Sequence, residues 1–216
     1  MTDFVHLHLH TEYSLLDGAV KVDDLVRHCK ENGIDTVAVT DHGNMYSSLK
    51  FAEKCKKNGI KYIIGCEFYV VDDYREHIDQ HADHLILLAK NKAGYVNLVQ
   101  LDSLAFVDGY YYRPRIDYTV LKEHTDGVIC LSACLAGRIP RYLMAGEYDK
   151  AKAFALEMKE AFGEDFYIEI QDHGIPEQKQ ILPLLVRLAR ETEIGLVATN
   201  DVHYLRKEDW EMQDVL

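Results

Sequence analysis

Short apolar or β-branched runs alternate with segments of helical periodicity along almost the whole chain. The runs occupy residues 4–9, 36–40, 62–64 continuing through 68–71, 85–89, 127–132, 166–170 and 196–199. Repeated strand–helix units favour a largely parallel sheet covered by helices, and seven strands are enough to close a barrel. The pattern therefore predicts an α/β fold, a seven-stranded (β/α)7 barrel of the TIM type.

Two of the intervening segments carry apolar stripes with the i, i+3, i+4, i+7 spacing of a helix. The stripes consist of Val22, Leu25, Val26 and Cys29, and of Ala151, Phe154, Ala155 and Met158. Another helix is expected to begin at Pro176, which suits a first helical turn, and to be kinked or split at Pro183. Gly195 is expected to end that helix in the left-handed conformation.

The length of 216 residues fits a single domain, 1–216, with one substantial core. No run of 18 apolar residues occurs and the first residues lack the pattern of a signal peptide, so no membrane partner is expected. The five cysteines follow no disulfide or CxxC spacing, which is typical of a reducing cytoplasm. The closing residues EDWEMQDVL resemble an interrupted helix, so we expect an excised N-terminal module of a larger protein.

The formal net charge of −12 argues against a strong nucleic-acid surface on this chain alone, because such surfaces neutralise phosphates. An acidic protein can still act on phosphates when bound cations reverse the local field. The positions of the metal-capable side chains therefore matter for the functional interpretation.

The stretch HLHLHTEYSLLDG, residues 6–18, places histidines on alternate residues and then an acid. Residues i and i+2 of a strand point to the same side, about 7 Å apart at roughly 3.3 Å per residue. His8 and His10 could therefore hold one cation or two adjacent cations, and Asp17 follows them closely. Taken alone, the stretch fits a polar edge strand equally well.

Further metal-capable side chains follow other predicted strands, in the motifs TDHGN, GCE, LSAC and TNDVH. They are His42, Glu67, Cys134, Asp201 and His203. Parallel α/β barrels build their active sites at the carboxyl ends of the strands. Because each motif ends a different strand, we expect these side chains to converge there.

His84 precedes its strand, so in a parallel strand it would lie at the wrong end of the barrel. The 12 residues 72–83 before it show no helical stripe and are few for a parallel crossover. We therefore expect strand 85–89 to return antiparallel and to bring His84 into the site. His81 is the alternative candidate.

The resulting ligand set is His8, His10, Asp17, His42, Glu67, His84, Cys134, Asp201 and His203. Nine ligands exceed the need of one tetrahedral ion, so we expect two or three divalent cations. Imidazole with carboxylate and one thiolate favours zinc, with manganese or iron as alternatives. Cations about 3.5–4 Å apart suit phosphoryl chemistry, in which a metal-bound hydroxide attacks and no separate protein base is needed.

The motifs HLHTEYSLLDG, TDHGN, GCEFYV, HLILLA, LSAC and TNDVHYL resemble those of the PHP (polymerase and histidinol phosphatase) domain family, in particular the PHP domains of bacterial replicative DNA polymerases. The resemblance covers essentially the whole chain, including GYYYRPRID. It implies a distorted seven-stranded barrel with a three-metal centre. It also implies phosphoesterase chemistry, which in some members is a metal-dependent 3′–5′ exonuclease.

The nine ligand positions of the family fall on the nine residues named above, and each holds a chemically competent side chain. The resemblance implies the 3′ end of DNA as substrate and the remainder of a polymerase chain as partner. Relatives that have lost ligands dock a separate proofreading exonuclease, which is a further possible partner. This chain shows no such loss.

Some candidate residues have a second, structural interpretation. Asp17 could cap the turn at Gly18, and Cys134 could be a small buried apolar side chain. Asp41 is expected to orient a ligand or to close its loop. Arg113 and Tyr112 could bind substrate through phosphate contact and stacking, or could pack on the barrel rim.

Three functions stay open at the level of the sequence. The first is a metal-dependent nuclease domain of a replicative polymerase. The second is a structural and docking module that uses its metals for stability. The third is a free-standing phosphomonoesterase of the histidinol phosphatase kind, against which the polymerase-like YYYRPRID motif counts.

Overall fold

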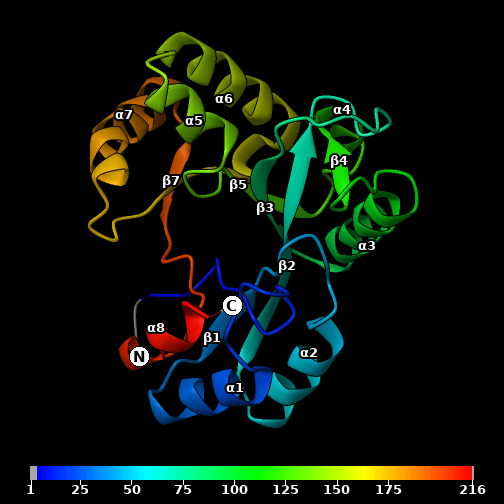
Figure 1. Ribbon diagram of the computed structural model, residues 1–216, viewed down its shortest axis with the longest axis vertical. Helices are drawn as coiled ribbons and strands as arrows, with labels where there is room; N and C mark the ends of the chain where they lie inside the picture. Colours follow the sequence, from blue (N-terminus) through cyan, green and yellow to red (C-terminus); the bar gives the residue numbers. More distant parts are fainter. Residues whose placement is uncertain (1–3, 216) are drawn as a thin grey trace.

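Seven strands form one curled sheet in the structure, a computed structural model that describes residues 4–215 (Figure 1). The strand order is β1-β2-β3-β5-β6-β7, and β4 pairs with β2 beside this path. The strands are β1 Thr36–Val39, β2 Lys61–Val71, β3 Asp83–Ala89, β4 Arg115–Asp117, β5 Val128–Leu131, β6 Phe166–Ile170 and β7 Gly195–Ala198. The fold is the predicted mixed α/β class, with a barrel-like sheet.

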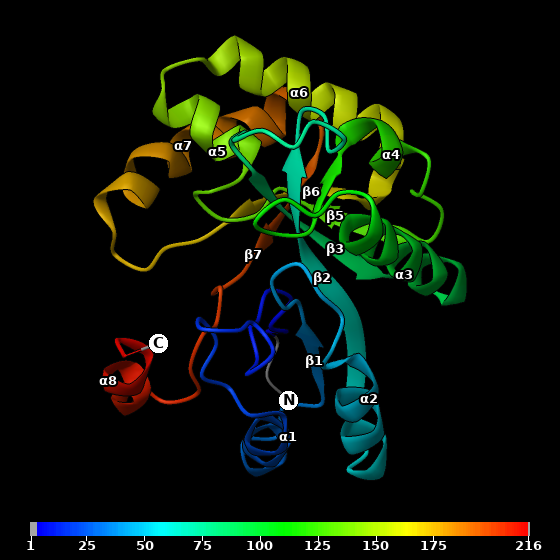
Figure 2. The same ribbon diagram turned by 45° about the vertical axis from the view of Figure 1, so that its right-hand side comes forward.

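Helices cover the outside of this sheet (Figure 2). They are α1 Val22–Glu31, α2 Ser48–Lys57, α3 Lys92–Val107, α4 Tyr118–Lys122, α5 Arg138–Met144, α6 Tyr148–Phe162, α7 Pro176–Thr192 and α8 Trp210–Gln213. Both predicted apolar stripes are buried, one on α1 and the other on α6. Among the described residues, no helix is both long enough and apolar enough to cross a bilayer.

The first predicted strand, residues 4–9, is not a regular strand, yet it takes the place of one. The backbone N–H groups of Ala38 and Thr40 donate to the carbonyls of His6 and Leu9, at 2.9 and 2.8 Å. On its other side, His10 N–H donates to Val202 O at 2.8 Å and Val202 N–H donates to His8 O at 3.1 Å. The segment thus links β1 to the chain after β7 and completes a ring.

The strand β3 runs antiparallel to β2, as the short connection predicts. Its register pairs His84 with Tyr69, near the carboxyl end of β2. The remaining neighbour of β3, β5, is also antiparallel to it, whereas β1–β2, β5–β6 and β6–β7 are parallel. The strand β4 was not predicted, because three residues are too few to show a periodic pattern.

The helix α7 begins at Pro176 as predicted, but it continues through Pro183 to Thr192 and is not split. The left-handed residue at its end is Glu193, with φ 53°, and not Gly195. Gly195 instead begins β7, where the ring of Tyr167 lies within 2.9 Å of the position a Cβ would take. Close packing therefore explains this glycine.

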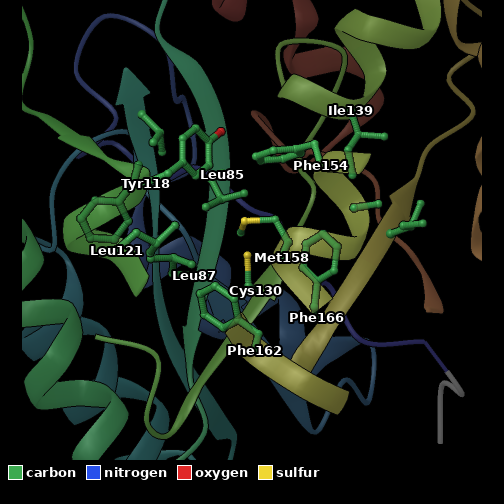
Figure 3. Packing of buried hydrophobic residues seen from close by; sticks show 14 of the residues in the cluster. Leu85, Leu87, Tyr118, Leu121, Cys130, Ile139, Phe154, Met158, Phe162 and Phe166 are labelled. Atoms are coloured by element: carbon green, nitrogen blue, oxygen red, sulfur yellow. The ribbon is translucent and has the colours of Figure 1, made fainter. Parts of the chain in front are cut away.

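The largest apolar core lies between the sheet and α5, α6 and α7 (Figure 3). In it, Met158 and Phe162 of α6 face Leu85 and Leu87 of β3, with Cys130 of β5 between them. A second core joins α1 and α2 to β1, and a small third cluster fills the inside of the ring. These cores fix the strand ends that carry the site.

We predict that Gly94→Ala destabilises the fold by about 1–3 kcal/mol, the usual cost of overpacking. A Cβ at Gly94 of α3 would lie 1.7 Å from the carbonyl oxygen of Gly127, so the helix would have to move away from the sheet. Chemical unfolding measures this change. As a control, Gly59→Asn fills open space in a left-handed turn that Asn tolerates, and should cost less than about 1 kcal/mol. Equal costs for the two variants would contradict the packing argument.

Candidate metal centre

The structure brings all nine predicted residues to one end of the ring. His8 and His10 lie on the N-terminal segment and Asp17 on the loop before α1. His42 follows β1, Glu67 lies inside β2, and His84 is the second residue of β3. Cys134 follows β5, and Asp201 and His203 follow β7.

Their donor atoms form three overlapping groups, in each of which all atoms lie within 4.8 Å of one another. The groups are His10, Asp17, His42 and His203; His8, His10 and Asp201; and His42, Glu67 and His84. Cys134 lies beside the third group, with its Sγ 4.0 Å from both Glu67 Oε1 and His84 Nδ1. Because His10 and His42 are shared, the three groups make one continuous cluster.

Inside the cluster, side chains that can all donate a lone pair to a cation lie very close together. Nε2 of His8 lies 3.1 Å from Nε2 of His10 and 3.0 Å from Oδ1 of Asp201. Oε2 of Glu67 lies 2.9 Å from Nδ1 of His42 and 3.1 Å from Nε2 of His10. Crowded lone-pair donors of this kind are typical of a cation site.

Four buried polar atoms of the cluster make no hydrogen bond of suitable geometry with residues 4–215, although facing nitrogen or oxygen atoms of the cluster lie only 2.9–3.0 Å from them. They are Asp17 Oδ2, His42 Nδ1, Glu67 Oε2 and Asp201 Oδ1. Buried polar groups almost always make a hydrogen bond of good geometry, so four that do not in one place require an explanation. Divalent cations would supply it, and the residues present therefore fit a metal centre.

Polar groups behind the cluster fix which nitrogen of each histidine faces inward. Nδ1 of His8 lies 2.7 Å from Glu169 Oε1, so this nitrogen donates and Nε2 is left with its lone pair toward the site. Nδ1 of His203 similarly donates to the backbone carbonyl of Asp201 at 2.9 Å. Such outer partners orient metal-binding imidazoles.

Asp41 acts on His10 through Ser14. Its carboxylate accepts from the backbone N–H of Thr11 at 2.6 Å and from the Ser14 hydroxyl at 3.1 Å. Because Ser14 donates its one proton there, its oxygen accepts from Nδ1 of His10 at 2.9 Å and from His42 N–H at 3.0 Å. Asp41 therefore closes the loop and also orients an imidazole, the two alternatives that the sequence left open.

Glu169 is the residue of this site that sequence reasoning missed. It is 1% exposed, and its carboxylate also accepts from the side chains of Gln171 and Thr199. The signal in the sequence was an acid within the apolar strand FYIEI, on the face opposite to Phe166 and Ile168. A buried carboxylate in a strand needs a partner, and here the partner is His8.

The charges of the cluster are strongly coupled. Burial by itself would lower the pKa of His8, but Glu169, Glu67 and Asp201 outweigh it and raise this pKa well above its usual value. In His42, the carboxylates of Glu67 and Asp17 likewise outweigh burial and raise the pKa to about 10. Burial would raise the pKa of Asp201, yet the neighbouring histidines hold it well below its usual range. Protons thus compete with any cation for these imidazoles.

The thiol of Cys134 follows the opposite trend. Burial raises its pKa well above the usual value, and the carboxylates of Glu67 and Asp201 raise it further. Without a cation this cysteine is a neutral thiol, whereas a coordinating thiol is deprotonated outright. The remaining four cysteines are buried, and all five thiols are free.

A pocket of about 650 Å³ adjoins the cluster at His84. Arg113 and Tyr112 line it, together with Tyr111. The guanidinium of Arg113 lies 4.6 Å from the centre of the Tyr69 ring, which in turn stacks on His42 at 5.7 Å. Arg113 therefore lies next to the cluster, and Tyr112 lines the same pocket.

Two nearby residues have structural roles in the described part of the chain. Arg115 is buried and donates to the backbone carbonyls of Gly109, Tyr74, Glu76 and Ile78. His81, the alternative to His84, is half exposed and lies 3.5 Å from Asp83, outside the cluster. Of these two histidines, His84 is therefore the one that lies in the metal cluster.

We predict that Glu169→Gln weakens the binding of Mn²⁺ or Zn²⁺ about tenfold, because it weakens the orientation of His8. Calorimetric titration of the metal-free protein measures the affinity, and circular dichroism checks that the variant is folded. Glu164→Gln replaces an exposed acid near β6 and serves as the control. Equal affinities of the two variants would exclude a positioning role for Glu169.

Known proteins resemble this chain in sequence over most of its length. The PHP domain profile matches residues 6–173. The chain is 49% identical to the DNA polymerase III subunit alpha of Treponema pallidum and 45% identical to that of Thermus aquaticus, over 99% of its own length. It spans about a fifth of these relatives, 19% and 18% of their length.

Two solved structures share the fold at low sequence identity. One, from Bifidobacterium adolescentis, is described as a metal-dependent phosphoesterase and has a TM-score of 0.56 at 17% identity, covering 93% of this chain and 87% of its own. The other is an amidohydrolase from Chromobacterium violaceum, with a TM-score of 0.60 at 13% identity, covering 97% and 95%. From the profile match and the close relatives together, the chain belongs to the PHP domain family.

Proposed function

We propose that this chain is the phosphoesterase module of a bacterial replicative DNA polymerase and that it removes nucleotides from the 3′ ends of DNA. The observation that carries the proposal is the convergence of eight imidazole and carboxylate side chains, with Cys134 beside them, in which four buried donor atoms lack a hydrogen bond of suitable geometry. The names of the relatives, DNA polymerase III subunit alpha, support the polymerase context. This context would place the chain in the bacterial cytoplasm.

The proposed ligands are the nine residues of the cluster, which would hold two or three divalent cations, with zinc, manganese or iron as candidates. Bound cations supply Lewis-acid chemistry: they acidify water and neutralise charge on phosphate oxygens. The hydroxide that the sequence analysis expects as the nucleophile remains a prediction. Mixed imidazole, carboxylate and thiol donors suit these metals better than magnesium or calcium.

The chain itself would contribute orientation and substrate contacts. Glu169 and Ser14 hold His8 and His10 with their lone pairs inward. Arg113 has a charged head beside the cluster and would pair with a phosphate, while Tyr112, 82% exposed, offers a ring for stacking on a base. The volume of the pocket, about 650 Å³, is that of a typical small-molecule site.

The acidic surface implies that this module does not recruit DNA by itself. With a net charge of −12, the chain as a whole would repel the phosphate backbone, whereas cations and Arg113 would attract it at the cluster. The remainder of the polymerase would therefore deliver the strand. A separate proofreading exonuclease is a further possible partner of such a module.

We predict that the protein shortens 5′-labelled single-stranded DNA one nucleotide at a time when manganese or zinc is added. The double variant His10→Ala, Asp201→Ala removes donors from two of the three groups and should lower the rate at least about a hundredfold. Gel analysis of the product ladder measures both rate and polarity.

Other outcomes of this assay would favour the other functions. Equal rates in the two proteins would refute the catalytic proposal. A chelator that lowers the melting temperature of an inactive protein would favour a structural module. Turnover of phosphomonoesters without DNA hydrolysis would favour a small-molecule phosphatase.

We further predict that Arg113→Ala raises the KM for DNA about tenfold, because a charge-assisted hydrogen bond to phosphate is lost. Metal content should not change, since Arg113 is not among the donor groups. Arg190→Ala removes an exposed arginine of α7 and should leave KM within twofold. An unchanged KM in Arg113→Ala would assign this residue to packing on Tyr69.

A further inference from the structure

The antiparallel strand β3 leaves part of the sheet without a helix. In a regular barrel, a helix forms each connection between neighbouring parallel strands and covers their outer face. Here residues 72–82 return from β2 to β3 without a helix, so no element crosses the outer face of β2 at this place. Figure 2 shows α2 and α3 as the two helices on the β2 side of the molecule.

A groove of about 350 Å³ lies between these helices. Ser48, Leu49 and Ala52 of α2 line it on one side, and Asn91, Lys92 and Tyr95 at the start of α3 on the other. Tyr62, Ile64 and Ala89 form its floor. Leu49 is 73% exposed, Tyr95 43% and Tyr62 40%, although side chains of this kind are normally covered.

The groove continues into a second hollow, of about 420 Å³, at the amino-terminal end of the ring. The two share Tyr62 and Ala89, and the second adds Leu7, Ile129 and Leu196 among other apolar residues. This continuous surface, here called the β2 groove, contains none of the nine residues of the metal cluster.

The charge of the β2 groove is opposite to that of the whole chain. Lys61, Lys90 and Lys92 are its charged residues, and no described acidic residue lines either hollow. Lys90 pairs with Asp165, whereas Lys61 and Lys92 make no ion pair with any of residues 4–215. A matching partner would combine apolar side chains with acidic flanks.

The relatives are much longer than this chain, which makes the rest of such a polypeptide a candidate partner. About four-fifths of those polymerase chains lie outside the part that matches this chain. We propose that the β2 groove is the docking surface for the remainder of the same polypeptide, through an amphipathic segment that takes the place of the missing crossover helix. The proposal rests on the polymerase context of the proposed function and is independent of nuclease activity.

The full-length polymerase chain provides the test. The double variant Leu49→Asp, Tyr95→Asp, here called the groove pair, places two negative charges in the groove. Both positions are exposed, so the domain itself should stay folded and keep its metal content. Limited proteolysis should release the domain about tenfold faster or more, because two apolar contacts are lost. Leu156→Asp on α6, 45% exposed, is the matched control and should change the rate less than twofold.

Two further arms complete the experiment. The double variant Lys61→Glu, Lys92→Glu should also accelerate release of the domain, because the docking segment is proposed to be acidic. An unchanged rate would show that the segment is not acidic. Equal release from the groove pair and the Leu156 control would overturn the docking proposal. A full-length dimer that becomes monomeric in the groove pair, with unchanged proteolysis, would instead assign the groove to a second copy. None of these outcomes depends on DNA hydrolysis.

Discussion

The carboxylate of Glu67 is the group around which the site is organised. It is 1% exposed in β2, where the backbone of Glu67 pairs with Ile86 of β3 on one side and with His42, after β1, on the other. Its oxygens lie 2.9–3.5 Å from nitrogens of His8, His10, His42 and His84. A buried carboxylate costs several kcal/mol unless positive charge surrounds it. The four imidazoles supply that charge when protonated, and cations supply it when they are not.

The same segments that surround Glu67 also close the ring of strands. The N-terminal segment carries His8 and His10, and its backbone bonds both to β1 and to the chain after β7, which carries Asp201 and His203. Nearly two hundred residues separate these two segments along the chain. A cation held between them would therefore stabilise ring closure by mass action as well as supply chemistry. The segments that close the ring are thus the segments that carry four of the nine cluster residues.

Much of this arrangement could be predicted because it follows from local patterns. The i, i+2 spacing of the histidines, the strand-end motifs and the short connection before His84 each have a direct physical meaning, and the antiparallel β3 was deduced from connection length. The regular strand predicted at residues 4–9 was wrong: the segment accepts through the carbonyls of His6, His8 and Leu9 at scattered positions and forms no continuous ladder with either neighbour. Glu169 and Ser14 were missed because their role depends on contacts over 161 residues and on a shared hydroxyl, neither of which leaves a periodic signal.

The reversal of one strand has consequences on both ends of the sheet. Because β3 runs antiparallel, its first residues reach the end of the ring where the other strands finish, and His84 can contact Glu67. The same reversal removes the need for a crossover helix, so the outer face of β2 between α2 and α3 is left apolar and uncovered. A regular barrel would have covered that face but would have placed His84 far from the cluster. Completing the donor set in this way therefore leaves an apolar surface exposed on the other side of the same strand, and exposed apolar surfaces of this size mark sites of interaction.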